Sequence, residues 1–139
     1  MQWFKAFIAG FVATLVFHQG MFGLLYLAGV IPVPPFNLTQ VPPLGVPQVV
    51  SLAFFGGLWG IALWALIRDR TRVAYWGGAV LFGALAPTAV AMLVVFPLKG
   101  QNVEMATWIG GLILNASWGL GVAVVMSLLG GKGKTINDF

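Results

Sequence analysis

Four long apolar segments, separated by short stretches that hold nearly every charge, constrain this chain more than any other feature. They are expected to form helices over residues 4–31, 49–67, 73–96 and 105–129. Because a helix rises by about 1.5 Å per residue, each segment can cross the roughly 30 Å hydrocarbon core of a bilayer. The sequence therefore predicts an all-α integral membrane protein, a compact bundle of four transmembrane helices with short loops.

The composition supports the same fold class and indicates one domain. Hydrophobic residues make up 60% of the chain and charged residues 7%, and the mean hydropathy is +0.97. A soluble domain of this size leaves much of its surface near water and could not cover so much apolar surface. The helices use most of the chain, so we expect a single transmembrane domain over 1–139 with a proline-rich outer loop at 32–48. Cysteine is absent, which removes disulfides, thiolate metal sites and thiol nucleophiles.

The positive charges predict an orientation. If the chain crosses the membrane four times, only Lys99 falls on one side, and the other side holds Lys5, Arg68, Arg70, Arg72, Lys132 and Lys134. Short loops rich in Lys and Arg stay in the cytoplasm, so both termini are expected there and the loop 32–48 outside. The small size and short loops favour a bacterial inner membrane. We attribute the net charge of +4 to topology and lipid contacts rather than to nucleic-acid binding.

Small residues recur at four-residue spacing in every apolar segment. Helices in lipid associate by close packing, so such stripes indicate contact faces. The stripes are Ala6, Gly10, Thr14 and His18; Gly56 and Gly60; Ala79, Gly83, Pro87 and Ala91; and Thr107, Gly111, Asn115, Gly119 and Ala123. The runs 57–60 and 116–119 are also alike, which either duplication of a helical hairpin or chance similarity between apolar sequences would explain.

Acidic residues are confined to the connections and the tail, at Asp69, Glu104 and Asp138. Ion-coupled transporters normally hold a carboxylate at depth in the membrane, so antiport of the small multidrug kind is disfavoured. Hydrolytic catalysis is disfavoured because the chain has no paired carboxylates in the helices, no HExxH motif and no serine with an evident base. A lone histidine cannot complete a metal site within one chain. We therefore expect no catalytic residue, no metal site and no cofactor.

A few polar or aromatic side chains remain as candidate ligand-binding residues, namely His18, Gln19, Thr88, Asn115, Ser117, Trp59 and Trp118. Counting the helical rise from the membrane boundaries puts His18 and Asn115 at one depth in the outer half, within about 8 Å of each other. The layer can consist of interhelical hydrogen bonds, or it can be a pocket for a small solute or lipid head group. Trp59 and Trp118 are either packing residues or an aromatic wall for a quinone, pigment or acyl chain.

The outer loop is apolar as well as rich in proline. Its prolines favour an extended, semi-rigid path with few backbone donors. We expect it to lie flat over the outer mouth of the bundle with Phe36, Leu38 and Leu44 turned inward. It could serve as a lid, as a docking strip for a partner or as a stiff connector.

Two classes of function remain. The first is a membrane protein without catalytic apparatus: a non-catalytic subunit, an assembly factor or an oligomeric scaffold, and not an enzyme. The alternative is a small-solute or lipid binding or transport protein, a channel-like oligomer that uses the layer around His18 and Asn115. The partners expected are membrane lipids together with further copies of the chain or a larger membrane complex.

Overall fold

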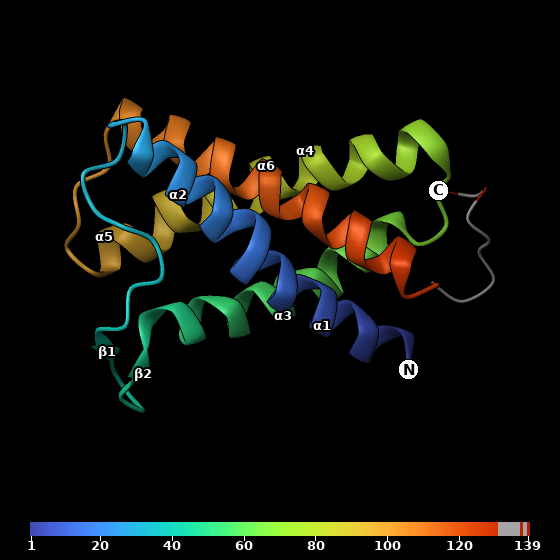
Figure 1. Cartoon of the computed structure of the whole chain (residues 1–139), viewed down its shortest axis with the longest axis horizontal. Helices are drawn as coiled ribbons and strands as arrows, with labels where there is room; N and C mark the ends of the chain where they lie inside the picture. The colour runs from blue at the N-terminus through green and yellow to red at the C-terminus, as the bar shows by residue number, and fades with distance from the viewer. Residues whose placement is uncertain (131–136, 138) are drawn as a thin grey trace.

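Four helical rods make up most of the protein, whose computed structural model describes residues 1–130, 137 and 139 (Figure 1). Two of the rods contain a short π-helical segment, named η1 and η2. The first rod is α1 (Gln2–Ala13), η1 (Thr14–His18) and α2 (Gln19–Leu27), and the second is α3 (Gln48–Ile67). The third is α4 (Arg72–Val90), η2 (Ala91–Val95) and α5 (Phe96–Leu98), and the fourth is α6 (Met105–Leu128). Each rod is long and apolar enough to cross a membrane.

The observed bounds agree closely with the predicted ones except at the end of the first rod. That helix was expected to continue to residue 31, but it ends at Leu27. Gly29 has φ +78°, and its amide and that of Val30 donate to the carbonyls of Tyr26 and Leu25. A glycine in this left-handed conformation closes the last turn of a helix, and Pro32 follows shortly after.

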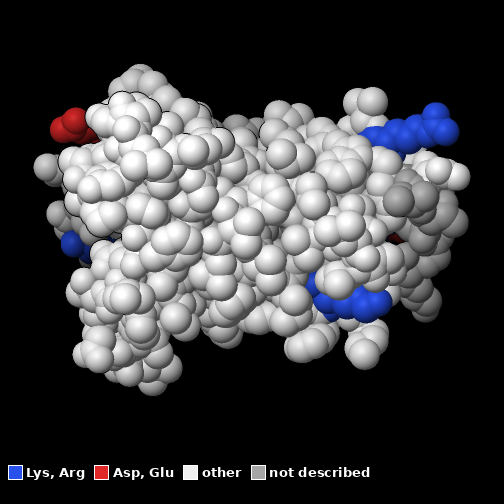
Figure 2. All heavy atoms as spheres, viewed as in Figure 1, with Lys and Arg blue, Asp and Glu red and all other residues white. Residues whose placement is uncertain are grey.

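The two ends of the bundle differ in what they carry. Both chain termini and the connection 68–71 lie at one end, which we call the terminus end, and the connections 28–47 and 99–104 lie at the other, the loop end (Figure 1). On the face shown in Figure 2, charged side chains gather near these two ends and the surface between them is uncharged. The all-α bundle of four long apolar helices predicted from the sequence is therefore confirmed.

The first and second rods form one helical hairpin, and the third and fourth rods form another. Glycines bring the two helices of each helical hairpin into backbone contact. A Cβ at Gly60 would lie 2.5 Å from the Ala6 carbonyl oxygen and 2.9 Å from Gly10 Cα, where α3 crosses α1. A Cβ at Gly83 would lie 2.9 Å from Gly119 Cα, where α4 crosses α6. Contacts this short leave no room for a side chain, so the predicted small-residue stripes are the contact faces of these two pairs.

The two hairpins repeat one packing scheme. In the first, the contact is made by Ala6 and Gly10 against Gly56 and Gly60, and in the second by Ala79 and Gly83 against Asn115 and Gly119. Gly56 and Gly60 precede Asn115 and Gly119 by the same number of residues, and Ala6 and Gly10 precede Ala79 and Gly83 by a second, larger constant offset. The similarity between the runs 57–60 and 116–119 thus extends to the way the helices pack.

The bulkiest buried side chains lie toward the terminus end and include Leu63, Trp64, Ile67, Tyr75 and Met126. The Tyr75 hydroxyl donates to the Ala123 carbonyl at 2.8 Å, so its polar atom is satisfied inside the core. Phe139 packs its ring edge-on to that of Tyr75, with centroids 4.7 Å apart, and its main-chain oxygen accepts a hydrogen bond from Trp76. The described end of the chain therefore packs against the core.

The expectation that the outer loop turns its apolar side chains inward is wrong. Phe36, Leu38 and Leu44 are 49%, 70% and 83% exposed. The segment closes on itself instead: β1 (Gln40–Val41) pairs antiparallel with β2 (Val46–Pro47). These main-chain bonds are made within the loop rather than to the bundle, and both leucines remain exposed.

Candidate functional site

Asn115 and Thr88, two of the predicted site residues, are brought together by the second hairpin. The Asn115 Nδ2 group donates to Thr88 Oγ1 at 2.9 Å, and Thr88 is fully buried. The bond joins α6 to α4 beside the Gly83–Gly119 contact, where the main chain of Asn115 also touches the position of Gly83. Close helix packing places both polar groups within reach of each other, and the bond satisfies them inside an apolar interface.

His18 and Gln19 form a separate group at the end of η1. Gln19 Nε2 donates to His18 Nδ1 at 3.1 Å, and Gln19 Oε1 accepts the amide of Phe36 at 2.7 Å. Phe36 has φ +58°, an uncommon conformation for a residue other than glycine. Both ends of the buried Gln19 amide are thereby occupied, and this side chain fastens the outer loop to the first rod.

The predicted layer around His18 and Asn115 is divided between these two groups. Among the residues that the structure describes, no hydrogen bond joins His18 or Gln19 to Asn115 or Thr88. The closeness of His18 to Asn115 remains a prediction. Ser117 is half-buried on α6. The sequence indicated these polar positions but not their pairing, which depends on how each helix is rotated about its axis.

The two deep tryptophans make different contacts. Trp118, only 3% exposed, donates its indole N–H to the Gly10 carbonyl at 3.1 Å. The Thr14 hydroxyl donates to the same carbonyl at 2.9 Å. Trp59 is half-buried and meets Phe82 edge-on at 6.0 Å between ring centroids. Trp118 therefore links the second hairpin to the first, and both rings pack on protein groups.

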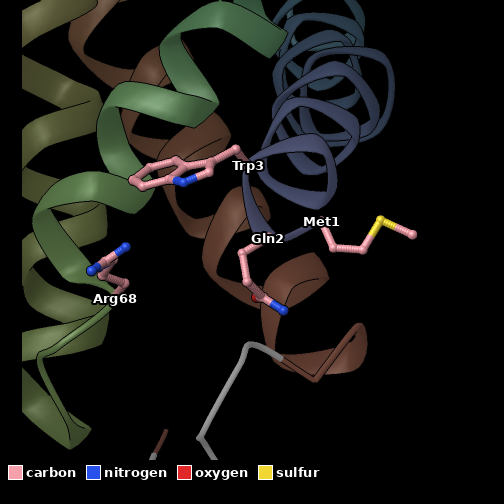
Figure 3. Close-up of a pocket in the computed structure, with 4 residues that line it drawn as sticks. All are labelled: Met1, Gln2, Trp3 and Arg68. Carbon is pink, nitrogen blue, oxygen red and sulfur yellow. The ribbon is translucent and has the colours of Figure 1, made fainter.

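A cavity of about 420 Å³ lies at the terminus end, far in sequence from the predicted layer, and is lined by Met1, Gln2, Trp3 and Arg68 (Figure 3). The Arg68 guanidinium stands 5.3 Å from the centroid of the Trp3 ring. Gln2 Oε1 is buried and has no hydrogen-bond partner among the described residues. The sequence placed Arg68 among the charges that set orientation but gave no signal for a cavity beside it.

In the described part of the chain, no group of three or more His, Cys, Asp or Glu residues is placed to hold a metal ion. Comparison with known protein families, with curated proteins and with solved structures finds no match to this chain. The function is therefore inferred from the residues and their geometry.

Proposed function

We propose that the protein is a non-catalytic helical membrane module that serves as a subunit, assembly factor or homo-oligomeric scaffold. One observation carries the proposal: three polar side chains within the apolar helices bond to the protein itself. Asn115 binds Thr88, Trp118 binds the Gly10 carbonyl and Gln19 binds the Phe36 amide. Groups that hold helices together in this way stabilise a bundle, whereas a solute site or an ion pathway needs polar groups that remain open to the ligand.

A module of this kind acts through its surface, which is apolar over much of its area. Charges concentrated at the two ends and apolar helices between them favour a multi-pass position in a membrane (Figure 2). The excess of Lys and Arg at the terminus end favours cytoplasmic termini, and the short loops favour a bacterial inner membrane. The partners proposed are lipids, together with more copies of this chain or a larger membrane complex.

The orientation predicts the result of reporter fusions. Fusions made after Ile67 and after Leu129 are expected to report a cytoplasmic location, because the cations next to these positions resist translocation. A fusion within 32–48 is expected to report an external location. The measurement is the paired activity of a reporter that works only in the cytoplasm and one that works only outside it. A cytoplasmic report from the 32–48 fusion would show that the orientation is inverted.

The function itself is tested by purification from native membranes in lipid nanodiscs formed without detergent. We expect either one stoichiometric membrane partner or a discrete oligomer of this chain. The variant Asn115→Leu combined with Thr88→Val, which removes both sides of one internal hydrogen bond, is expected to keep that assembly. A monomer that binds or transports a solute saturably, and loses this activity in the folded variant, would instead establish the alternative function at the predicted polar layer.

A further inference from the structure

The segment 37–47, which we call the outer hairpin, has the surface chemistry of a membrane-inserted element. No charged residue occurs anywhere between Lys5 and Arg68, so the uncharged character of the helices continues through this connection. At the same end of the bundle, the other connection carries Lys99 and Glu104. Leu38 and Leu44 are 70% and 83% exposed on the hairpin. Large exposed apolar groups without nearby charge mark surfaces that bind lipid or protein.

Much of the backbone of the outer hairpin is hydrogen-bonded within the segment and its junction with α3. The amides of Gln48, Val49 and Gly45 donate to the carbonyls of Thr39, Asn37 and Val41 at 2.8, 3.0 and 2.9 Å, respectively. The Asn37 side chain also donates to Gln48 Oε1 at 2.8 Å and accepts the Thr39 amide at 2.9 Å. Prolines at 42, 43 and 47 have no amide hydrogen to satisfy. Because unpaired backbone groups are costly in surroundings poor in water, these bonds make the hairpin compatible with the boundary of a bilayer.

The position of the outer hairpin matches this chemistry. It projects sideways from the bundle beside the start of α3, rather than extending beyond the loop end along the long axis (Figure 1). The exposed apolar side chains Val50 and Phe54 continue along α3 from that point. The hairpin and the exposed side of α3 are therefore neighbouring uncharged surfaces, and lipid that covers the helix would also meet the hairpin.

From these observations we infer that the outer hairpin is a lateral membrane anchor, which inserts Leu44 and Leu38 at the boundary between head groups and acyl chains in the leaflet at the loop end. The inference rests on the proposed membrane location. The loop would then contact lipid, whereas the sequence predicted that it covers the mouth of the bundle. An anchor at the start of α3 would fix the depth of that helix, and Gln19 would transmit the same restraint to the first rod through Phe36.

The absence of cysteine allows the anchor to be tested with single labels in the purified full chain, reconstituted in phosphatidylcholine vesicles. Three variants, Leu44→Cys, Gln101→Cys and Leu85→Cys, each carry one environment-sensitive NBD fluorophore. Gln101 is the control in the other connection at the loop end, and Leu85, 59% exposed on α4, reports whether the helices themselves are inserted. Doxyl-labelled lipids quench a fluorophore within the bilayer, and iodide quenches one in water.

We expect the label at residue 44 to be quenched by lipids with the doxyl group near the head group, and several-fold less by iodide than the label at residue 101. The label at residue 85 is expected to be quenched by lipids with the doxyl group deep in the chain. Iodide quenching at 44 equal to that at 101 would overturn the anchor. Protection from both quenchers at 44 would also overturn it, in favour of contact with a second copy. If lipids with a deep doxyl group did not quench the label at residue 85, the membrane location itself would be refuted. That result can be told apart from both results at residue 44 that would overturn only the anchor.

Discussion

Gly119→Ala is expected to destabilise the bundle by about 1–3 kcal/mol, the usual range for forcing extra atoms into a filled interface. A Cβ at this position would collide with the main-chain carbonyl of Ala79 and lie 3.2 Å from Gly83 Cα. Both obstacles belong to the backbone of α4, so no side chain can turn aside to make room. The helices must separate instead, and that movement also strains the Asn115–Thr88 hydrogen bond one turn away.

Gly110→Ala provides the matched control in the same helix. A Cβ at Gly110 meets no atom within 4 Å in the described part of the chain. Alanine favours a helix over glycine by up to about 1 kcal/mol, so this variant is expected to be neutral or slightly more stable. The measurement is the midpoint of unfolding, followed by circular dichroism as denaturing detergent is added. Equal midpoints for the two variants would show that α4 and α6 do not approach as closely as the structure indicates.

The apolar helices were predictable because their signal is local and long. Each run of apolar residues is long enough for a membrane span, and Gly60 and Gly119 mark faces that depend only on the helical period. Those faces turned out to be the contacts between α1 and α3 and between α4 and α6. Features that depend on a single helix could therefore be predicted from the sequence.

The pairing of polar groups was not predictable, because it depends on two helices at once. A count of helical rise gives the depth of His18 and of Asn115, but not the direction in which either side chain points. The π-helical segments add to the difficulty, since a π turn changes the rotation of everything that follows it. His18 lies at the end of η1, Thr14–His18, so its partner could not be derived from an ideal helical period.

The prediction for the outer loop was wrong for a different reason. Its apolar side chains suggested burial, whereas hydrogen bonds such as that between Asn37 and Gln48 close the segment on itself.

Trp118→Ala is expected to have the largest effect of the substitutions considered, a loss of about 3–5 kcal/mol of stability, as for other buried large-to-alanine changes. The indole is almost fully buried and lies in the contact between the two hairpins, where it donates to the Gly10 carbonyl. Removal of the ring leaves a cavity that neither hairpin can fill alone, because each is already held at backbone contact by its own glycines. The Thr14 hydroxyl still donates to the same carbonyl, so that acceptor stays satisfied.

Two further variants separate the causes of this loss. Trp118→Phe keeps most of the ring volume and removes the indole donor, so we expect it to cost only about 1 kcal/mol, the usual value of one hydrogen bond. Trp59→Ala is the control at the equivalent position of the first hairpin, where the ring is half-buried against Phe82, and its effect should be clearly smaller than that of Trp118→Ala. Unfolding midpoints in denaturing detergent measure all three. If Trp59→Ala cost as much as Trp118→Ala, the deeper burial of Trp118 would not set its contribution to stability, which would contradict the prediction.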